Sequence, residues 1–179
     1  MKQKLFLAGV VIVSSSFILP LKNTKIYSDK LFAYIFMTVD PMTGKTKGKL
    51  EQLTALYQKP KGKTSSPAVY IVNGVKSPVR LKIAEAVFQM VPDDASITLN
   101  HNLYISLYKL TSTRTARTLT ITTDGSGDVA ILPITITQPD LYNYIISVTV
   151  AILPGEYAFV DKTTTTADGN MRVWTFGID

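Results

Sequence analysis

Turn-forming residues recur along this chain at intervals of roughly 8 to 15 residues, which leaves room for strands but not for long helices. The turns are built from Asp-Pro, Asn-Gly, Pro-Asp, Asp-Gly and Pro-Gly pairs, and the stretches between them are rich in Val, Ile, Thr and Tyr. β-Branched and aromatic side chains favour a pleated, half-buried surface. The spacing predicts an all-β fold built as an antiparallel β-sandwich.

About ten strands are expected, with no helix after residue 30. They are residues 31–39, 49–57, 68–72, 79–90, 96–110, 117–123, 129–137, 142–153, 156–160 and 171–177. Residues 49–57 are short enough to be two helical turns, although the flanking turn residues favour a strand. Asn73-Gly74 is a strong hairpin signal. Residues 31–39 are apolar on both faces, as in a buried core strand or a strand that pairs with a neighbouring subunit.

The first 28 residues resemble an export segment. A basic start is followed by 17 uncharged residues, Leu5 to Leu21, and then by Lys22. A signal peptide cut after Ser16 or Ser28, an uncleaved membrane anchor and a buried helix are the alternatives. We therefore expect a leader over 1–28 and a single sandwich domain over 29–179. The first two alternatives place that domain outside the cytoplasm, in the periplasm, at the cell surface or anchored to the membrane of a bacterium.

Charge and cysteine content exclude several classes of function. The net charge is +6, but four of the 19 Lys and Arg residues flank the apolar leader: Lys2, Lys4, Lys22 and Lys25. The remaining 15 face 13 Asp and Glu, which leaves +2 from Asp29 onward and no general basic footprint for nucleic acid. The chain has no cysteine, so disulfides, thiolate metal sites and a thiol nucleophile are all ruled out.

One local motif carries a structural expectation. In Leu153-Pro154-Gly155-Glu156-Tyr157, we expect the leucine to close the core, Pro-Gly to turn the chain, and the Tyr157 hydroxyl to reach back to the backbone as a tyrosine corner. Together with the closing VWTFGID, this stretch resembles the last hairpin of uncharacterised immunoglobulin-like or transthyretin-like β-sandwich modules of secreted bacterial proteins. Residues 75–80 resemble an early segment of such modules. The resemblance implies a fold, a Greek-key β-sandwich of the immunoglobulin-like kind, and no activity.

Catalytic and metal-binding patterns are missing from the sequence. His101 is the only histidine, and no nucleophile motif accompanies it. The Asp124 to Asp128 run lacks the glutamate that an EF-hand loop requires, so a plain turn is expected. Glu85 and Glu156 are the best candidates for a carboxylate-dependent hydrolase, although Glu156 is expected to be exposed beside its turn. We predict no catalytic, cofactor-binding or metal-ligating residues, no cofactor and no enzymatic activity.

Two remaining features point to binding. Six lysines lie in two turn-rich segments, in contrast to the near-neutral remainder of the domain: Lys45, Lys47, Lys49, Lys59, Lys61 and Lys63. They are either solvated loop residues that discourage aggregation or contacts to an anionic lipid or glycan. Trp174 shares a strand face with Arg172 and Phe176, which favours a core or rim position, while an exposed ring would suit a sugar.

The sequence thus predicts a non-enzymatic structural or protein-interaction module, such as a subunit of a bacterial surface or secretion assembly. Its expected partners are other envelope proteins or further copies of itself, with an anionic lipid or glycan as an additional ligand and no nucleic acid. A carbohydrate-binding sandwich is the alternative, and a carboxylate-dependent hydrolase is the next.

Overall fold

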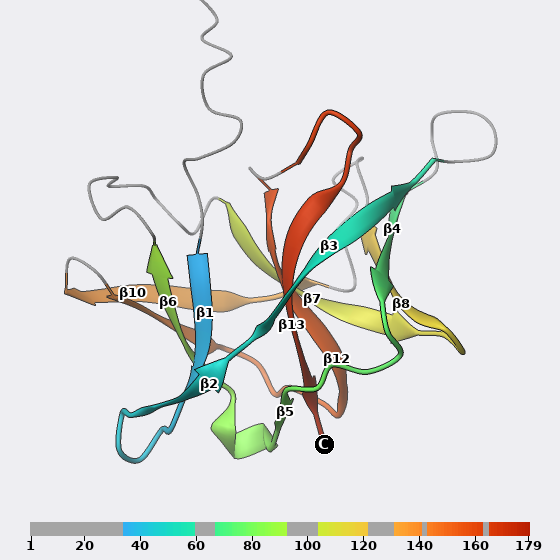
Figure 1. The fold of residues 1–179 in the computed structure, drawn as a ribbon. Coiled ribbons are helices and arrows are strands. Elements are labelled where there is room, and N and C mark those ends of the chain that lie inside the picture. Colours follow the sequence, from blue (N-terminus) through green and yellow to red (C-terminus); the bar gives the residue numbers. More distant parts are fainter. Residues whose placement is uncertain (1–33, 60–66, 93–103, 122–130, 141–142, 163–164) are drawn as a thin grey trace, which may run out of the picture.

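The chain folds as β-structure throughout the part that can be described. The structure, a computed structural model, describes residues 34–59, 67–92, 104–121, 131–140, 143–162 and 165–179 (Figure 1). The strands are β1 (Tyr34–Val39), β2 (Thr46–Lys49), β3 (Glu51–Gln58), β4 (Ala68–Asn73), β5 (Arg80–Leu81), β6 (Val87–Pro92), β7 (Ile105–Ser112), β8 (Ala116–Ile121), β9 (Ile131–Leu132), β10 (Ile134–Asp140), β11 (Asn143–Val148), β12 (Gly155–Asp161) and β13 (Met171–Ile178). A single turn of 3₁₀ helix, η1 (Ile83–Glu85), lies between β5 and β6. The all-β prediction is confirmed.

One layer is a five-stranded antiparallel sheet with the order β10-β11-β6-β1-β2. The strand β1 lies inside this sheet, with Ile35 opposite Val91 of β6 and Met37 opposite Lys49 of β2. Within the chain, β1 pairs with β6 from Tyr34 to Thr38 and with β2 from Met37 to Val39. The core-strand interpretation of this segment is confirmed for residues 34–39, and pairing with a neighbouring subunit stays a prediction.

The other layer is a closed barrel rather than the expected second open sheet. Its six antiparallel strands have the order β12-β13-β3-β4-β8-β7, and β7 closes the circle by pairing with β12 from Ile105↔Asp161 to Leu110↔Glu156. Two short strands are additional to these six: β9 pairs with β7, and β5 pairs with β13. The prediction of a Greek-key sandwich is corrected on this point: β7 pairs on one side with β8 and on the other with β12, so the sheet has no open end.

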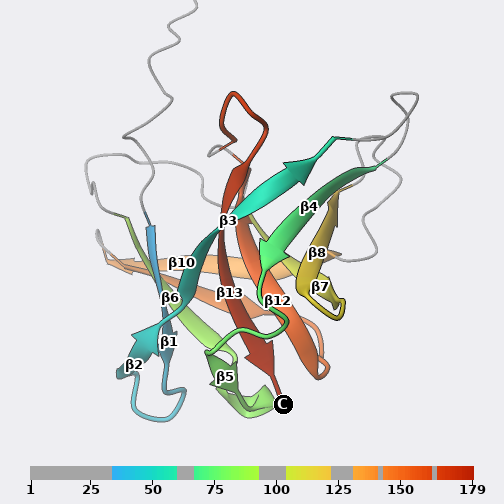
Figure 2. The same cartoon turned by 45° about the vertical axis from the view of Figure 1, so that its right-hand side comes forward.

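A single extended segment links the two layers. It belongs to the five-stranded sheet as β2 and to the barrel as β3, and Figure 2 shows it running from one layer into the other. Leu50 separates the two strands, and its side chain is buried in the core between the layers. The strand predicted over 49–57 is confirmed, whereas the segment expected to be only a turn, 40–49, also contains β2.

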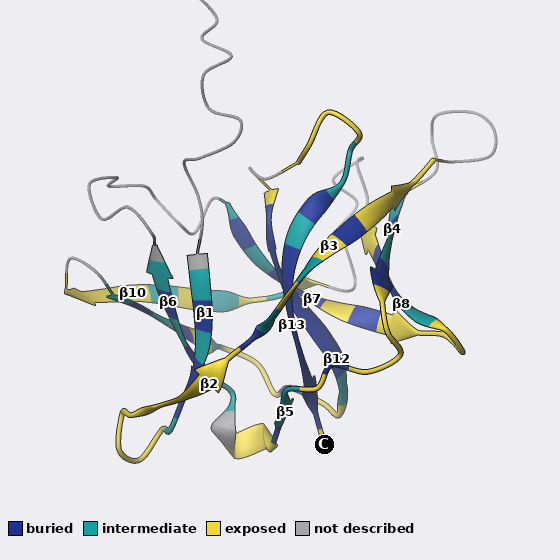
Figure 3. Cartoon of the chain, viewed as in Figure 1, coloured by how far each residue is buried: buried dark blue, intermediate teal, exposed yellow. Residues whose placement is uncertain are grey.

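Two hydrophobic cores lie back to back. The core between the layers contains Phe36, Leu50, Leu81, Phe88, Met90, Ile105, Leu107, Tyr144, Ile146, Ile152, Tyr157, Phe159, Trp174, Phe176 and Ile178. The core inside the barrel contains Ala55, Tyr70, Val72, Tyr108, Leu110, Leu119, Ala158, Val160, Met171 and Val173. The strands β7, β12 and β13 contribute alternate residues to each core, so this wall of the barrel is buried on both faces (Figure 3).

The Asn73-Gly74 turn does not make the expected hairpin. Gly74 adopts a positive φ of 81°, as a tight turn requires. However, β4 lies between β3 and β8, so neither of its edges can accept the segment that follows. That segment instead crosses the end of the barrel and pairs in parallel with β13 as β5. The strand expected over 79–90 is accordingly divided into β5, η1 and β6.

The expected leader, residues 1–28, lies outside the described residues. Within the described ranges, no helix has both the length and the apolar character needed to cross a bilayer.

Candidate functional site

Buried charged side chains gather at one end of the barrel. Arg117 of β8 and Glu156 of β12 are 0% and 5% exposed. Each points inward because it has the same strand parity as its apolar neighbours, Leu119 for Arg117 and Ala158 for Glu156. A buried charge is tolerated only when it is paired and hydrogen-bonded, so the partners of these two residues define the site.

The Arg117 guanidinium holds the turn that follows β4. Its Nε donates to the Gly74 carbonyl at 3.1 Å, and its Nη2 donates to the Asn73 carbonyl at 2.7 Å. Nη2 also lies 3.4 Å from Glu51 Oε2, and Nη1 lies 3.5 Å from Glu156 Oε2. One arginine from β8 thereby connects β3, β12 and the turn at the barrel end.

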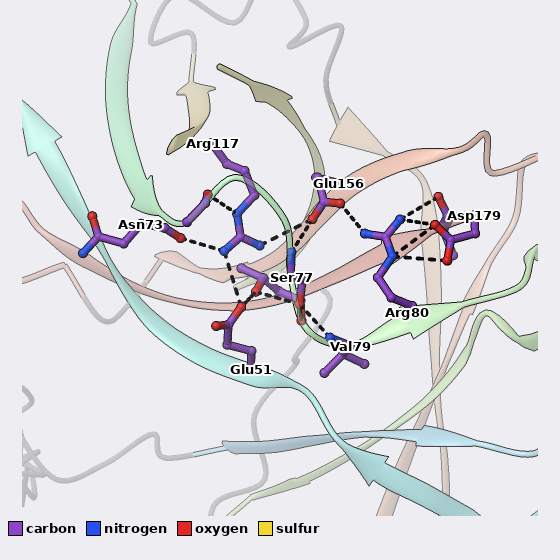
Figure 4. Close-up of polar contacts among 11 residues, drawn as sticks. Glu51, Asn73, Ser77, Val79, Arg80, Arg117, Glu156 and Asp179 are labelled. Atoms are coloured by element: carbon purple, nitrogen blue, oxygen red, sulfur yellow. Dashed lines mark hydrogen bonds and ion pairs between the residues drawn. The ribbon is translucent and has the colours of Figure 1, made fainter. Parts of the chain in front are cut away.

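Both carboxylate oxygens of Glu156 are engaged (Figure 4). Oε2 accepts a hydrogen bond from the Ser77 backbone N–H at 2.8 Å and faces Arg117, while Oε1 pairs with Nη1 of Arg80. The Ser77 hydroxyl in turn donates to the Thr175 carbonyl at 3.1 Å. The prediction that Glu156 is exposed beside its turn is wrong, because the residue follows the inward parity of β12.

Arg80 extends the network to the end of β13. Its Nε donates to Asp179 at 3.1 Å for Oδ1 and 3.3 Å for Oδ2. Hydrogen bonding from Arg80 lowers the pKa of Asp179, and the same contact raises the pKa of Arg80. The guanidinium passes so close to Gly177 that a Cβ there would stand 1.6 Å from Nη1. Only glycine leaves the space that Arg80 needs to reach Glu156.

Residues 74–81, which we call the strap, close this end of the barrel. Backbone hydrogen bonds bind the strap to β13, from Gly177 N to the Val79 carbonyl at 2.8 Å and from Asp179 N to the Leu81 carbonyl at 3.0 Å. Between the paired strands β13 and β3, the Thr175 hydroxyl donates to Glu51 at 2.6 Å. The charged groups of this network are paired with other groups of the same chain. The arrangement therefore binds the strap to the barrel.

The six lysines predicted as an anionic-surface contact are not brought together. Lys45, Lys47 and Lys49 are exposed on the β1–β2 hairpin, whereas Lys59 is exposed beyond the far end of β3. Lys49 and Lys59 are ten residue steps apart along almost continuous strand, which corresponds to about 33 Å. Lys61 and Lys63 lie outside the described residues. Among the described lysines of this set, the three of the hairpin share one location.

The Pro-Gly turn before β12 has the geometry of a tyrosine corner. The Tyr157 hydroxyl donates to the Leu153 carbonyl at 2.6 Å, and Gly155 adopts a positive φ. Burial raises the pKa of Tyr157, so the hydroxyl remains a donor at neutral pH. The side chain of Leu153 does not close the core, because it is 61% exposed; its neighbour Ile152, at 4%, does so instead. Pro154 is exposed.

The residues behind the alternative functions have different outcomes. Trp174 is 1% exposed and its ring centroid lies 4.6 Å from that of Phe36, so its predicted core position is confirmed and the ring is not available to stack on a sugar. Glu85 lies in η1 rather than in a strand. His101 and the segment from Asp124 to Asp128 lie outside the described residues. In the described ranges, no three His, Asp or Glu side chains are grouped so that they could hold a metal ion.

Sequence reasoning missed Arg117, Arg80, Glu51 and Ser77. A signal existed for Arg117, because it has the parity of Leu119 and Ile121, the apolar residues of its strand. A charge on the apolar parity of a strand predicts a buried, paired group. No comparable signal marks Ser77 and Arg80, whose roles depend on the path of the strap. Comparisons with protein-family models, curated proteins and solved structures found no match to this chain.

Proposed function

We propose that this chain is a non-enzymatic structural or protein-interaction module of a bacterial envelope, and that it binds its partner polypeptide along the outer edge of β10. The observation that carries the proposal is the difference between the two ends of the five-stranded sheet. A partner strand adds to a sheet through main-chain hydrogen bonds, so an edge without protection is where such a partner binds.

The β2 end of the sheet is protected. This strand has four residues, two of them lysines, and a register irregularity separates Thr38 from Val39 in its pairing with β1. Short length, lysines and bulges are the devices by which proteins prevent strand addition at an edge.

The β10 end has none of these devices in its first half. Residues Ile134 to Thr137 are uncharged, β-branched and in regular register with β11, from Ile134↔Val148 to Thr137↔Ile145. Pro139 and Asp140 come only at the end of the strand. Thr135 and Thr137 are exposed, while Ile134 and Ile136 pack against the core between the layers. This edge is suited to accept an extended segment of another chain.

The buried charges support the non-enzymatic part of the proposal. Glu156, one of the two hydrolase candidates, has both carboxylate oxygens engaged by Ser77, Arg80 and Arg117. A general acid or nucleophile must be accessible to a substrate, and a side chain that is 5% exposed and fully paired serves the fold instead.

Lysine substitutions on β10 test the proposal. The full chain, the double variant Thr135→Lys/Thr137→Lys and the control Ser147→Lys would be compared by light scattering and by capture of envelope proteins. Ser147 is exposed on β11, opposite Thr135, so the control adds charge one strand inward from the edge. We expect the wild type and the control to self-associate or retain a partner that the double variant loses. A wild type that stays monomeric and retains no partner, or equal behaviour of all three proteins, would contradict the proposal.

A further inference from the structure

The tip of the β1–β2 hairpin presents an apolar side chain to solvent. Met42 is 92% exposed, the highest value among the exposed large hydrophobic residues of the described chain. It follows Pro41 in the loop from Asp40 to Lys45, and Figure 3 shows this loop as an exposed projection of the five-stranded sheet. Single exposed apolar residues are common on proteins, so the surroundings of Met42 decide its meaning.

The loop holds Met42 in a defined position. Asp40 Oδ1 accepts hydrogen bonds from the backbone N–H groups of Met42 at 2.9 Å and Thr43 at 3.0 Å. The backbone of Asp40 adds two more, accepting from Gly44 N and donating to the Lys45 carbonyl, both at 2.8 Å. These four hydrogen bonds connect Asp40, at the start of the loop, to the residues from Met42 to Lys45. Met42 is therefore displayed by an ordered turn.

Positive charge surrounds this apolar tip. Lys45, Lys47 and Lys49 are all exposed on the same hairpin, and Asp40 is its only acidic residue. The Asp40 carboxylate lies 3.5 Å from Lys47 and is also used by the loop backbone. The hairpin thus retains a net charge of about +2 around one protruding methionine.

We propose that the β1–β2 hairpin docks on an anionic phospholipid surface, with Met42 entering the boundary between headgroups and acyl chains while Lys45, Lys47 and Lys49 contact the headgroups. Charge complementarity selects an anionic partner. Met42 selects a lipid over a soluble polyanion, because a nucleic acid or a glycan would bind the lysines and leave the methionine in water. This inference is independent of the β10 edge.

The absence of cysteine from the chain allows a site-specific test. Full-length Met42→Cys and Lys59→Cys would each carry an environment-sensitive fluorophore. They would be titrated with vesicles of phosphatidylglycerol and phosphatidylethanolamine, and with phosphatidylcholine vesicles. We expect a blue shift of the probe at position 42 with the anionic vesicles only, and none at position 59. Since both proteins carry the same leader, its own affinity for lipid does not account for a difference between the two positions.

Charge variants provide the second readout. Each lysine near an anionic surface is worth about five-fold in affinity, so Lys45→Gln/Lys47→Gln/Lys49→Gln should weaken the hairpin's binding on the order of 100-fold. The matched control Lys59→Gln should leave it unchanged. Met42→Ser, which retains the lysines and the Asp40 loop, should weaken binding and preserve its salt dependence.

Three outcomes would overturn the inference. The probe at position 42 would remain unshifted, or positions 42 and 59 would respond alike, or the triple variant would bind as the wild type does. Lysine-dependent binding of heparin or DNA without a shift at position 42 would identify a soluble polyanion as the ligand instead.

Discussion

Gly177 shows how a single missing side chain organises the barrel end. The Arg80 guanidinium lies against its Cα and reaches Glu156 on one side and Asp179 on the other. The residue lies within β13, where a glycine normally weakens a strand. Its presence there is explained by the space that it leaves for Arg80.

We predict that Gly177→Ala destabilises the protein by about 1 to 3 kcal/mol, because the new Cβ displaces Arg80 and breaks charged hydrogen bonds. Chemical denaturation would measure this loss, with Gly48→Ala as the control, since a Cβ at Gly48 meets no atom within 4 Å. On an Arg80→Ala background, Gly177→Ala should cost little. An undiminished cost on that background would show that Arg80 is not the cause.

The same contact predicts a dependence on acid. Because Arg80 lowers the pKa of Asp179 in the folded state, the unfolded state binds protons more readily. The contribution of Asp179 is fully present above its usual pKa of 3.8 and is lost as the pH falls through the lower folded value. Denaturation midpoints measured from pH 7 to pH 3 should therefore decline at the acid end, and less steeply in Asp179→Asn. Parallel profiles for the two proteins would refute the assignment.

At the scale of elements, the alternation of apolar and polar residues predicted burial correctly where a strand has one buried face. The strand β8 follows its predicted pattern, with Leu119 buried and Thr120 exposed. The pattern was less informative for β12 and β13, whose two faces are both buried, and it did not reveal that residues 134–140 form an edge. Neighbouring strands, and not the strand itself, decide these properties.

Amide hydrogen exchange should separate the elements accordingly. The strands β12 and β13 are hydrogen-bonded on both sides and buried on both faces, so we expect their amides to exchange about 100-fold or more slowly than those of β10. Exchange measured by mass spectrometry on peptides from 155–161 and 134–140 would test this order. Equal protection would show that β10 is covered on its outer edge, contrary to the proposed function.

At the scale of the whole molecule, the two layers are inseparable because the two hydrophobic cores share one wall of the barrel. The strands β7, β12 and β13 supply side chains to the core between the layers and to the core inside the barrel. Removing either core would expose an apolar face of the same three strands. The layers should therefore depend on each other for stability.

We predict a single cooperative unfolding transition. Phe88→Ala in the core between the layers should cost about 3 to 5 kcal/mol, and Leu119→Ala inside the barrel about 2 to 5 kcal/mol, because both side chains are 0% exposed. Each variant should lower the midpoint of one and the same transition, followed by Trp174 fluorescence and by circular dichroism. Transitions that separate in either variant would show that the layers fold independently.

The sequence by itself determined the class of fold, most of its strands and several burials. Alternation and turn residues are local properties, so they predicted most of the strands, although not β2 or the division of residues 79–90, and also the buried Trp174 and the position of Tyr157 beside its turn. Only the tertiary structure decided that the second sheet closes, that Asn73-Gly74 leads into a strap, that Glu156 is paired with two arginines, and that Lys59 lies away from the three lysines of the hairpin. These features depend on which strand edges are already occupied and on contacts between residues far apart in the chain, such as Ser77 and Thr175. No local pattern records such contacts, because they arise only when the strands have found their neighbours.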